Sequence, residues 1–415
     1  MTGARVLWVG GTSALARTYF EECHPARGVS SIIAAAPWKP AWSLPKDVAF
    51  VELNLSSQES VRSLFERLPH GVDSIIFGVR ASLVYGTPEE HEMLSNNLEL
   101  LLRSGAAAGV TSVLHISSIA VADHVTSQHM IRETDPVPPL EQIASPYDRF
   151  KLRSEHVVDT ACSDLPGVKV WTHLRISGIF SNDPRCIQCT AIRRQALVSL
   201  ATTACIDFNS SRNVGHAIAL VLERQHAGTH PHDLPSNGST TMQPTGRQLY
   251  YYTRCTREPA AYWHHVADYR RANGLWYGLW LPGWVADLLV PLMRKAMEAI
   301  GTDFAKSLDY LMAVASHEHS ADNSAFRTAF PDIQGSEESI FQCFLRLRNR
   351  QDAQRREHKK NLHGTTGGCF LMLMMCLGVA VAVALMAAES AWGSMLAHAP
   401  PPPAPRGWWH PLASR

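Results

Sequence analysis

The chain has 415 residues, of which 46% are hydrophobic and 18% charged, and 38 Lys and Arg against 37 Asp and Glu leave a formal net charge of +1. This composition excludes a disordered polyampholyte, a collagen-like chain and a uniformly basic nucleic-acid binder. The length suffices for one large domain or two smaller ones. The nine cysteines are scattered and odd in number, with Cys186 and Cys189 as the close pair, and they indicate reduced thiols rather than a disulfide framework.

Residues 1–182 alternate between strand-like and helix-like segments. Six short apolar runs have the length of buried strands: 4–10, 31–35, 48–53, 72–77, 113–116 and 168–171. Helices are expected between them, at 15–23, from a Ser56 or Ser57 cap to Leu68, and around Leu94–Leu102. Strands alternating with helices predict an α/β fold, a Rossmann-type doubly wound parallel sheet.

Beyond residue 183 the pattern becomes irregular. Residues 183–345 are expected to form a smaller mixed substrate region, with some elements returning to the sheet. Within it, 227–247 have the composition of an exposed loop, and an aromatic cluster follows from Tyr250 to Trp284. Residues 281–300 are apolar at helical spacing, which suits either a helix on a membrane surface or a buried helix of this region.

The C-terminal section predicts a membrane anchor. Residues 367–388 are 22 consecutive residues without a charge, enough for a helix to cross a hydrocarbon core of about 30 Å. The segment 346–366 before them is basic, whereas the Pro-rich tail 389–415 carries few charges. The positive-inside rule then places the catalytic part in the cytosol. We expect no nucleic-acid partner, because no aromatic platform or binding motif accompanies the basic run.

A glycine turn directly follows the first predicted strand. Gly10 and Gly11 lead through Thr12, Ser13, Ala14 and Leu15 into a helix. At this place in a doubly wound sheet, small residues let backbone N–H groups approach a pyrophosphate, and the helix N-terminus supplies partial positive charge. The three-glycine spacing is incomplete: counted from Gly11 the later positions are Ala14 and Arg17, and counted from Gly10 they are Ser13 and Ala16. The turn nevertheless predicts an NAD(P) site.

The end of the second predicted strand leaves the choice of cofactor open. An acidic residue there favours NAD, and a basic residue accommodates the extra phosphate of NADP. Residues 34–39 contain no carboxylate, and Lys39 is a candidate phosphate partner. NAD and NADP both remain, with a slight chemical preference for NADP.

Three residues form a candidate catalytic set. Ser118 follows the fifth strand, and Tyr147 and Lys151 lie 29 and 33 residues later, four apart on a predicted helix. An ammonium near a phenol favours the phenolate, so Tyr147 can accept a proton while Lys151 lowers the pKa of that phenol. The Ser118 hydroxyl can hold the substrate oxygen, and hydride can pass to a nicotinamide. We expect no metal.

Taken together, these motifs resemble the extended short-chain dehydrogenase/reductase superfamily over roughly residues 4–350. The resemblance rests on five segments: 10–14, 115–121, 147–151, 174–180 and 207–217. It implies an NAD(P) cofactor bound by the glycine turn and by Tyr147 and Lys151. A reductase or epimerase acting on another small ketone or alcohol remains an alternative within this superfamily, as does a noncatalytic membrane-anchored NAD(P)-binding protein.

Within the superfamily the layout resembles the 3β-hydroxysteroid dehydrogenases, and most of all the decarboxylating sterol-4α-carboxylate 3-dehydrogenases. The features are Tyr251, Tyr252 and Trp263, the segment 281–284, and Leu345-Arg346. The resemblance implies oxidation of a sterol 3β-hydroxyl to a ketone and, in the decarboxylating branch, loss of CO2 from C4. It also implies an endoplasmic reticulum membrane and leaves a homodimer open. By the match, Ser118 orients the hydroxyl, Tyr147 is the base and Lys151 holds the ribose.

Overall fold

The computed structural model describes thirteen stretches of the chain: residues 3–24, 26–68, 70–79, 87–122, 128–143, 145–181, 186–196, 198–200, 205–227, 247–253, 260–275, 279–281 and 319–361. The chain divides into two units, residues 1–352 and 353–415. The sheet and the candidate site lie in the first unit.

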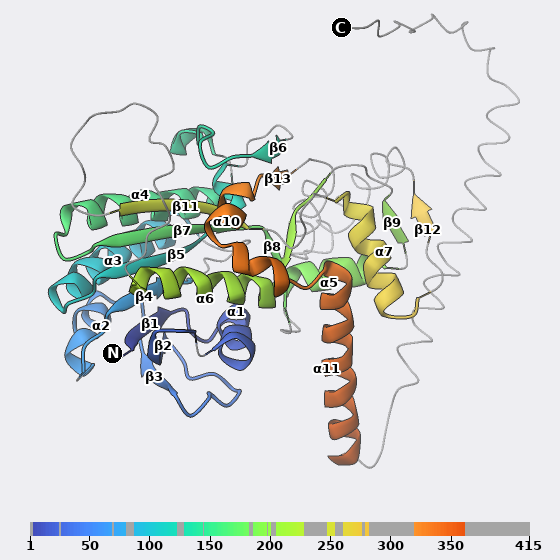
Figure 1. Cartoon of the computed structure of the whole chain (residues 1–415), viewed down its shortest axis with the longest axis horizontal. Helices are drawn as coiled ribbons and strands as arrows, with labels where there is room; N and C mark the ends of the chain where they lie inside the picture. Colours follow the sequence, from blue (N-terminus) through green and yellow to red (C-terminus); the bar gives the residue numbers. More distant parts are fainter. Residues whose placement is uncertain are drawn as a thin grey trace, which may run out of the picture. The chain divides into compact units, whose positions relative to one another are not determined.

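The first unit is built on a parallel sheet of seven strands (Figure 1). From one edge to the other these are β11 (Arg247–Thr253), β7 (Val170–Ile176), β5 (Ser112–Ser118), β4 (Ser74–Phe77), β1 (Ala4–Val9), β2 (Val29–Ala36) and β3 (Val48–Glu52). The chain moves outward from β1 to β3 and then returns to build the other half from β4. This reversal between β1 and β4 is the point at which open α/β sheets bind ligands, beyond the carboxyl ends of the strands.

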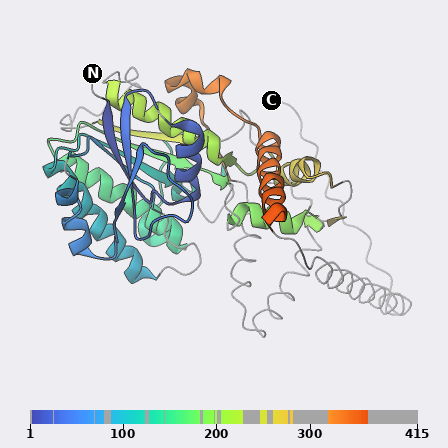
Figure 2. The same cartoon turned by 90° about the horizontal axis from the view of Figure 1, so that it is seen from below.

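Helices cover both faces of this sheet (Figure 2). They are α1 (Ala14–Thr18), α2 (Gln58–Arg62), α3 (Pro88–Ala107), α4 (Pro146–Asp164), α6 (Ser211–Ala227) and α10 (Ser324–Ala329). The other described helices, α5 (Ile187–Gln195), α7 (Tyr262–Ala272) and α11 (Ile340–Asn361), pack on one another. Every residue of β4, β5 and β7 is buried. Burial on both faces fits the apolar residues at the centre of these strands, and β5 and β7 also bury polar residues, among them His115, His173 and Arg175.

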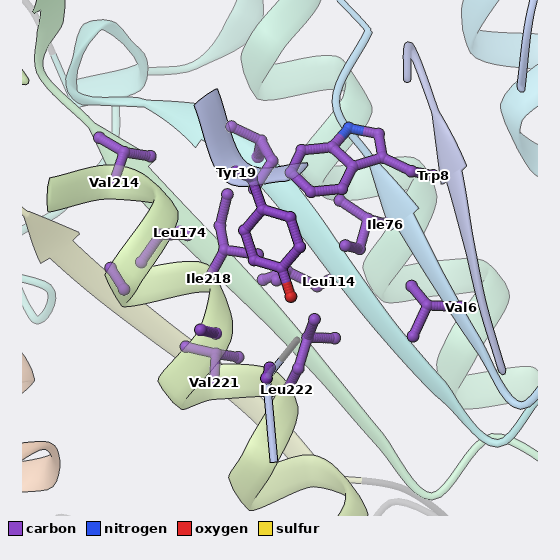
Figure 3. Close-up of a cluster of buried hydrophobic side chains, with 14 of the residues drawn as sticks. Val6, Trp8, Tyr19, Ile76, Leu114, Leu174, Val214, Ile218, Val221 and Leu222 are labelled. Atoms are coloured by element: carbon purple, nitrogen blue, oxygen red, sulfur yellow. The ribbon is translucent and has the colours of Figure 1, made fainter. Parts of the chain in front are cut away.

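Two apolar layers hold the helices to the sheet. On one face Trp8 and Tyr19 pack with Val214, Ile218 and Leu222 of α6 (Figure 3). On the other face, residues of α2, α3 and α4 pack against the opposite side of the same strands. A third layer joins α5, α7 and α11 with β8 through Phe180, Ile192, Val266, Phe344 and Leu347, so these four elements have a core of their own.

Three pairs of short strands complete the described architecture. They are β6 (Gln128–Ile131) with β13 (His319–Ala321), β8 (Gly178–Phe180) with β10 (Phe208–Ser210), and β9 (Val198–Leu200) with β12 (Leu279–Leu281). Short 3-10 turns lie at Phe65–Arg67, Ile119–Ala122, Leu140–Gln142 and Pro331–Gly335.

The expected Rossmann-type parallel sheet is confirmed, and all six predicted strands belong to it. A seventh strand, β11, lies in the region expected to be irregular. It is an edge strand that holds Tyr250–Tyr252, and a strand paired on one side needs no continuous apolar run. The helix expected at 15–23 is α1 followed by a π-helical turn, Tyr19–Cys23.

The predicted membrane anchor lies outside the described residues, as does the tail 389–415. Among the helices that the structure describes, none combines the length and the apolar character needed to cross a bilayer. Of the apolar helix expected at 281–300, only Leu281 is described, and it ends strand β12.

Candidate cofactor and catalytic site

Gly10 and Gly11 sit where β1, β2 and β4 come closest. Gly10 has a φ of +85°, and a Cβ there would lie 2.8 Å from the carbonyl oxygen of Gly78, just past β4. A Cβ on Gly11 would lie 2.8 Å from the Cα of Ala34 in β2. Both glycine N–H groups donate to the carbonyl oxygen of Ala35. Only glycine fits at either position, because any side chain would force the strand ends apart.

The structure decides between the two readings of the incomplete glycine motif. Ser13 is the N-cap of α1, and its hydroxyl accepts the N–H of Ala16 at 3.2 Å. Ala16 is fully buried against the sheet, whereas Arg17 donates to Glu21 at 2.7 Å and lies over Trp42. The motif is therefore Gly10, Ser13 and Ala16. The third position asks for close helix–sheet packing, which alanine still permits.

This turn fits the pyrophosphate of a dinucleotide. Helix α1 begins at Ala14, directly after the residues Thr12 and Ser13. The first N–H groups of a helix have no partner within it, and they carry partial positive charge toward the turn. Ala14 and Leu15 supply two of these groups, at the reversal point of the sheet where a pyrophosphate binds.

The adenosine end of the site is small and uncharged. Ala34, Ala35 and Ala36 are all buried at the end of β2. Trp38 is 80% exposed and Lys39 is also exposed, three residues beyond the strand. The Lys39 side chain is therefore accessible to the 2′-phosphate of NADP. Residues 37–39, directly after β2, contain no carboxylate that could bind the ribose hydroxyls of NAD.

The structure brings the predicted catalytic residues to the same edge of the sheet. Ser118 is the last residue of β5, and its Oγ accepts the backbone N–H of Ala120 at 3.2 Å. Tyr147 is half-buried in the first turn of α4, which Ser145 caps and Pro146 begins. Lys151 follows one helical turn later on the same face.

Lys151 is fixed by the backbone at the ends of two strands. It is 4% exposed, and its Nζ donates to the carbonyl oxygen of Ile116 at 2.8 Å and to that of Val79 at 3.2 Å. Ile116 lies two residues before Ser118 on β5, and Val79 lies just past β4. The ammonium is therefore held between the ends of β4 and β5, next to the reversal point between β1 and β4, where a bound dinucleotide would pass.

A buried ion pair lies behind the site. Glu155, four residues after Lys151 on α4, receives two hydrogen bonds from Arg175 of β7, at 3.0 and 2.7 Å. Ser117 donates to the same carboxylate at 2.5 Å. The Arg175 and Glu155 side chains are 4% and 1% exposed. This paired geometry satisfies two charges that would otherwise be costly to bury.

Two buried histidines lie next to this ion pair, and together with it they form a polar layer behind the site. His115 and His173 face each other through their Nδ1 atoms at 3.0 Å, and His173 Nε2 lies 2.8 Å from Asp159. Burial, together with the charges of His173, Lys151 and Arg175, lowers the pKa of His115 well below its usual value. Because the Asp159 carboxylate only accepts, we assign the His173 proton to Nε2 and let His115 donate from Nδ1.

Sequence reasoning missed Glu155, Asp159, His173 and Arg175. The available signal was the spacing of Lys151, Glu155 and Asp159, which repeats every four residues and puts all three on one helix face. A row of charges on one face is typical of a solvated surface, so this spacing alone does not indicate burial.

A family model described as the NAD dependent epimerase/dehydratase family matches residues 9–235, more than half of the chain. The chain belongs to this family. The extended short-chain dehydrogenase/reductase class is thereby confirmed, and so is a nicotinamide dinucleotide cofactor, with NAD and NADP both open. The family match supports an oxidoreductase-type enzyme of epimerase/dehydratase class. It does not reach the finer sterol branch.

Solved structures of low sequence identity share the fold. One is the enzyme WbmH of Bordetella bronchiseptica in complex with NAD+, at 12% identity and a TM-score of 0.56, covering 82% of this chain and 96% of that one. Another is the UDP-N-acetylglucosamine 4-epimerase of Bacillus cereus, at 12% identity and 0.55, covering 83% and 98%. A third is the terminal R domain of the myxalamid PKS-NRPS pathway, at 17% identity and 0.59, covering 88% and 94%. No curated protein sequence matches the chain.

Proposed function

We propose that this family member is an NAD(P)-dependent dehydrogenase that oxidises the 3β-hydroxyl of a sterol or steroid to the ketone. The observation that carries the reaction class is the placement of Lys151, held between the ends of β4 and β5 and one helical turn from Tyr147. This geometry supports proton removal from an alcohol at the reversal point of the sheet.

Each residue of the site has one task. Tyr147 accepts the hydroxyl proton, because the nearby Lys151 ammonium favours its phenolate form. Ser118 donates a hydrogen bond to the substrate oxygen and keeps it in line with Tyr147. Lys151 also faces the ribose of the cofactor. The bound nicotinamide supplies the acceptor for hydride.

The sterol substrate is inferred from the sequence. The resemblance to the 3β-hydroxysteroid dehydrogenases includes the aromatic residues Tyr251, Tyr252 and Trp263, and Tyr251 is buried beside β7. With a 4α-carboxylate on the substrate, the product is a β-keto acid, which loses CO2 readily. Such substrates are nearly insoluble in water, so an enzyme attached to the bilayer meets them at higher local concentration.

We also propose that residues 367–388 cross a membrane, with residues 1–366 in the cytosol. We propose that this membrane is that of the endoplasmic reticulum. The support is the absence of charge over this stretch and the basic segment before it. An asparagine glycosylation acceptor placed in the tail 389–415 is expected to be glycosylated in microsomes, and one placed at the start of the chain is not. The reverse pattern would show that the orientation is wrong. If neither acceptor is glycosylated and the protein is soluble, residues 367–388 do not cross a membrane.

A second candidate function is epimerisation of a nucleotide sugar. The family model is that of epimerases and dehydratases, and one structure of similar fold is a UDP-N-acetylglucosamine 4-epimerase. An epimerase returns the hydride to its substrate, so reduced cofactor does not accumulate.

Turnover by the full chain in lipid nanodiscs separates these functions. Sterol 3β-alcohols, with and without a 4α-carboxylate, are expected to produce NADH or NADPH, and Tyr147→Phe is expected to slow this by about 10²-fold or more. Epimerisation of UDP-sugars without reduced cofactor would replace the sterol assignment by the second candidate. Cofactor binding without turnover of either class would favour the noncatalytic alternative.

A further inference from the structure

Two cysteines meet at the start of helix α5. Cys186 is the N-cap of this helix, and its Sγ accepts the backbone N–H of Cys189 at 3.4 Å. Cys189 lies three residues later, so the two cysteines share the first turn of the helix.

Each thiol is also a donor to the segment around β8. Cys186 donates to the carbonyl oxygen of Ile179 at 3.3 Å, and Cys189 donates to that of Ser181 at 3.5 Å. These contacts hold the first turn of α5 against the end of β8. Formation of a bond between the two sulfurs would remove both donors at once.

The surroundings make the two thiols unequal. The neighbouring Cys189 thiol, together with the backbone N–H groups of Cys189 and Ser181, lowers the pKa of Cys186, whereas the Cys186 thiol and burial raise the pKa of Cys189. By contrast, burial raises the pKa of Cys162 to about 12. A thiolate beside a protonated thiol is the arrangement that Cys-x-x-C pairs use in thiol–disulfide chemistry.

A pocket opens beside Cys189, one helical turn from the buried Cys186. Cys189 is half-buried and lines a pocket together with Ser181, Arg193, Tyr269, Asn273 and Arg348. Among the described residues, no group of three His, Cys, Asp or Glu side chains forms a metal site.

We propose that Cys186 and Cys189 form a redox-active dithiol that a hydroperoxide converts reversibly to a disulfide. The Cys186 thiolate attacks a peroxide oxygen, the O–O bond breaks, and the released hydroxide takes up a proton to give water and a sulfenic acid. The Cys189 sulfur then attacks the sulfenic sulfur, the S–O bond breaks, and a second water leaves with the Cys189 proton. In sum, two thiols and one hydrogen peroxide give one disulfide and two waters.

The test uses the reduced full chain and hydrogen peroxide, followed by alkylation of the remaining thiols and peptide mass spectrometry. We expect the peptide holding Cys186 and Cys189 to lose two hydrogens at peroxide levels that leave Cys162 alkylated, and dithiothreitol to restore both thiols. Cys186→Ser is expected to leave Cys189 reduced, while Cys189→Ser traps Cys186 as a sulfenic acid that a dimedone probe labels.

Cys343→Ser is the matched control, because the Cys343 thiol is buried close enough to Cys189 to affect its charge. This variant is expected to form the disulfide as the wild type does. The proposal fails if both thiols stay alkylated at peroxide levels that oxidise Cys162, or if the bond formed joins Cys189 to Cys343. Disulfide formation in the wild-type chain is measured without any variant, so a variant that fails to fold does not obscure the result.

Discussion

The imidazole rings of His115 and His173 meet Nδ1 to Nδ1 at 3.0 Å, between the sheet and helix α4. With His173 held by Asp159, the His115 ring can accept a further proton only at Nε2, which is buried and has no hydrogen-bond partner among the described residues. Lys151 and Arg175 add positive charge nearby. Protonation of His115 would therefore place an unpaired charge beside two others.

The buried rings of His115 and His265 predict a loss of stability in mild acid. Burial lowers the folded-state pKa of His115, and burial also lowers the pKa of His265 to about 4. In the unfolded chain the rings of His115 and His265 protonate near pH 6.5, so below that pH the unfolded state binds more protons than the folded state and is stabilised relative to it. Each ring contributes its full stabilisation above about pH 6.5 and loses roughly 1.4 kcal/mol per pH unit below it.

Thermal unfolding at pH 7.5 and pH 5.5 measures this effect. The melting temperature of the wild type is expected to fall on acidification. The melting temperature of His115→Asn is expected to fall less, because this variant lacks one of the titrating rings. His156→Asn, on an exposed position of α4, is the control and should follow the wild type. An equal pH dependence in His115→Asn and in the wild type would show that His115 is not held neutral.

The buried pair of Glu155 and Arg175 predicts a strong asymmetry between single and double substitution. Glu155→Gln leaves the Arg175 guanidinium without its counter-charge at 4% exposure, and this is expected to cost about 3–5 kcal/mol of unfolding free energy. The double variant Glu155→Leu with Arg175→Met removes both charges and should recover most of that loss. Denaturant unfolding of the three proteins measures the difference, and a double variant no more stable than the single one would contradict the account.

The glycine turn predicts a position-specific effect on cofactor binding. In Gly11→Ala the new Cβ would meet Ala34 at 2.8 Å, so β1 and β2 must separate where the pyrophosphate binds. We expect NAD(P)H affinity, measured by fluorescence titration, to fall about tenfold or more. Gly335→Ala is the matched control, since a Cβ there meets nothing within 4 Å, and it should leave affinity unchanged. Equal affinities in both variants would show that the dinucleotide does not use this turn.

The sequence predicts those parts of the fold that depend on local pattern. Buried parallel strands leave apolar runs of four to seven residues, which is why all six inner and neighbouring strands are recognisable. Strand β11 is not, because it begins with the polar residues Arg247 and Gln248 and its three consecutive tyrosines resemble an aromatic cluster rather than an aliphatic run. Ser118, Tyr147 and Lys151 follow from order and spacing, since a helix fixes which residues share a face.

The polar layer behind the site is formed by contacts between residues that are far apart in the sequence. Glu155 and Arg175 are 20 residues apart, His115 and His173 are 58 apart, and each pair joins different elements. A charged side chain on a helix is usually exposed to solvent. It can be buried without a large free-energy cost only when a side chain of opposite charge from another element pairs with it. No spacing rule within one element identifies that partner, so such residues become visible only in the folded chain.

The basic run before the predicted membrane span gives the last prediction, because part of it is engaged within the fold. Arg346 of α11 binds Glu338 and reaches Glu22 at 3.4 Å, and Arg350 binds Glu22 at 2.6 Å. Arg346 is 15% exposed and its partners 8% and 11%. Arg346→Met is therefore expected to lower the unfolding free energy by about 3 kcal/mol, since it removes the guanidinium that pairs with the shielded Glu338 carboxylate and leaves Glu22 with Arg350.

Arg103→Gln provides the comparison for Arg346→Met. Its side chain and its partner Glu99 are both nearly half exposed, and such surface pairs contribute about 0.2–1 kcal/mol. Denaturant unfolding of both variants, with vesicle flotation on anionic lipid in parallel, separates stability from membrane binding. If Arg346 serves the bilayer rather than the fold, its loss would weaken flotation and leave unfolding unchanged. We expect the opposite, because its guanidinium is already occupied by Glu338 and Glu22.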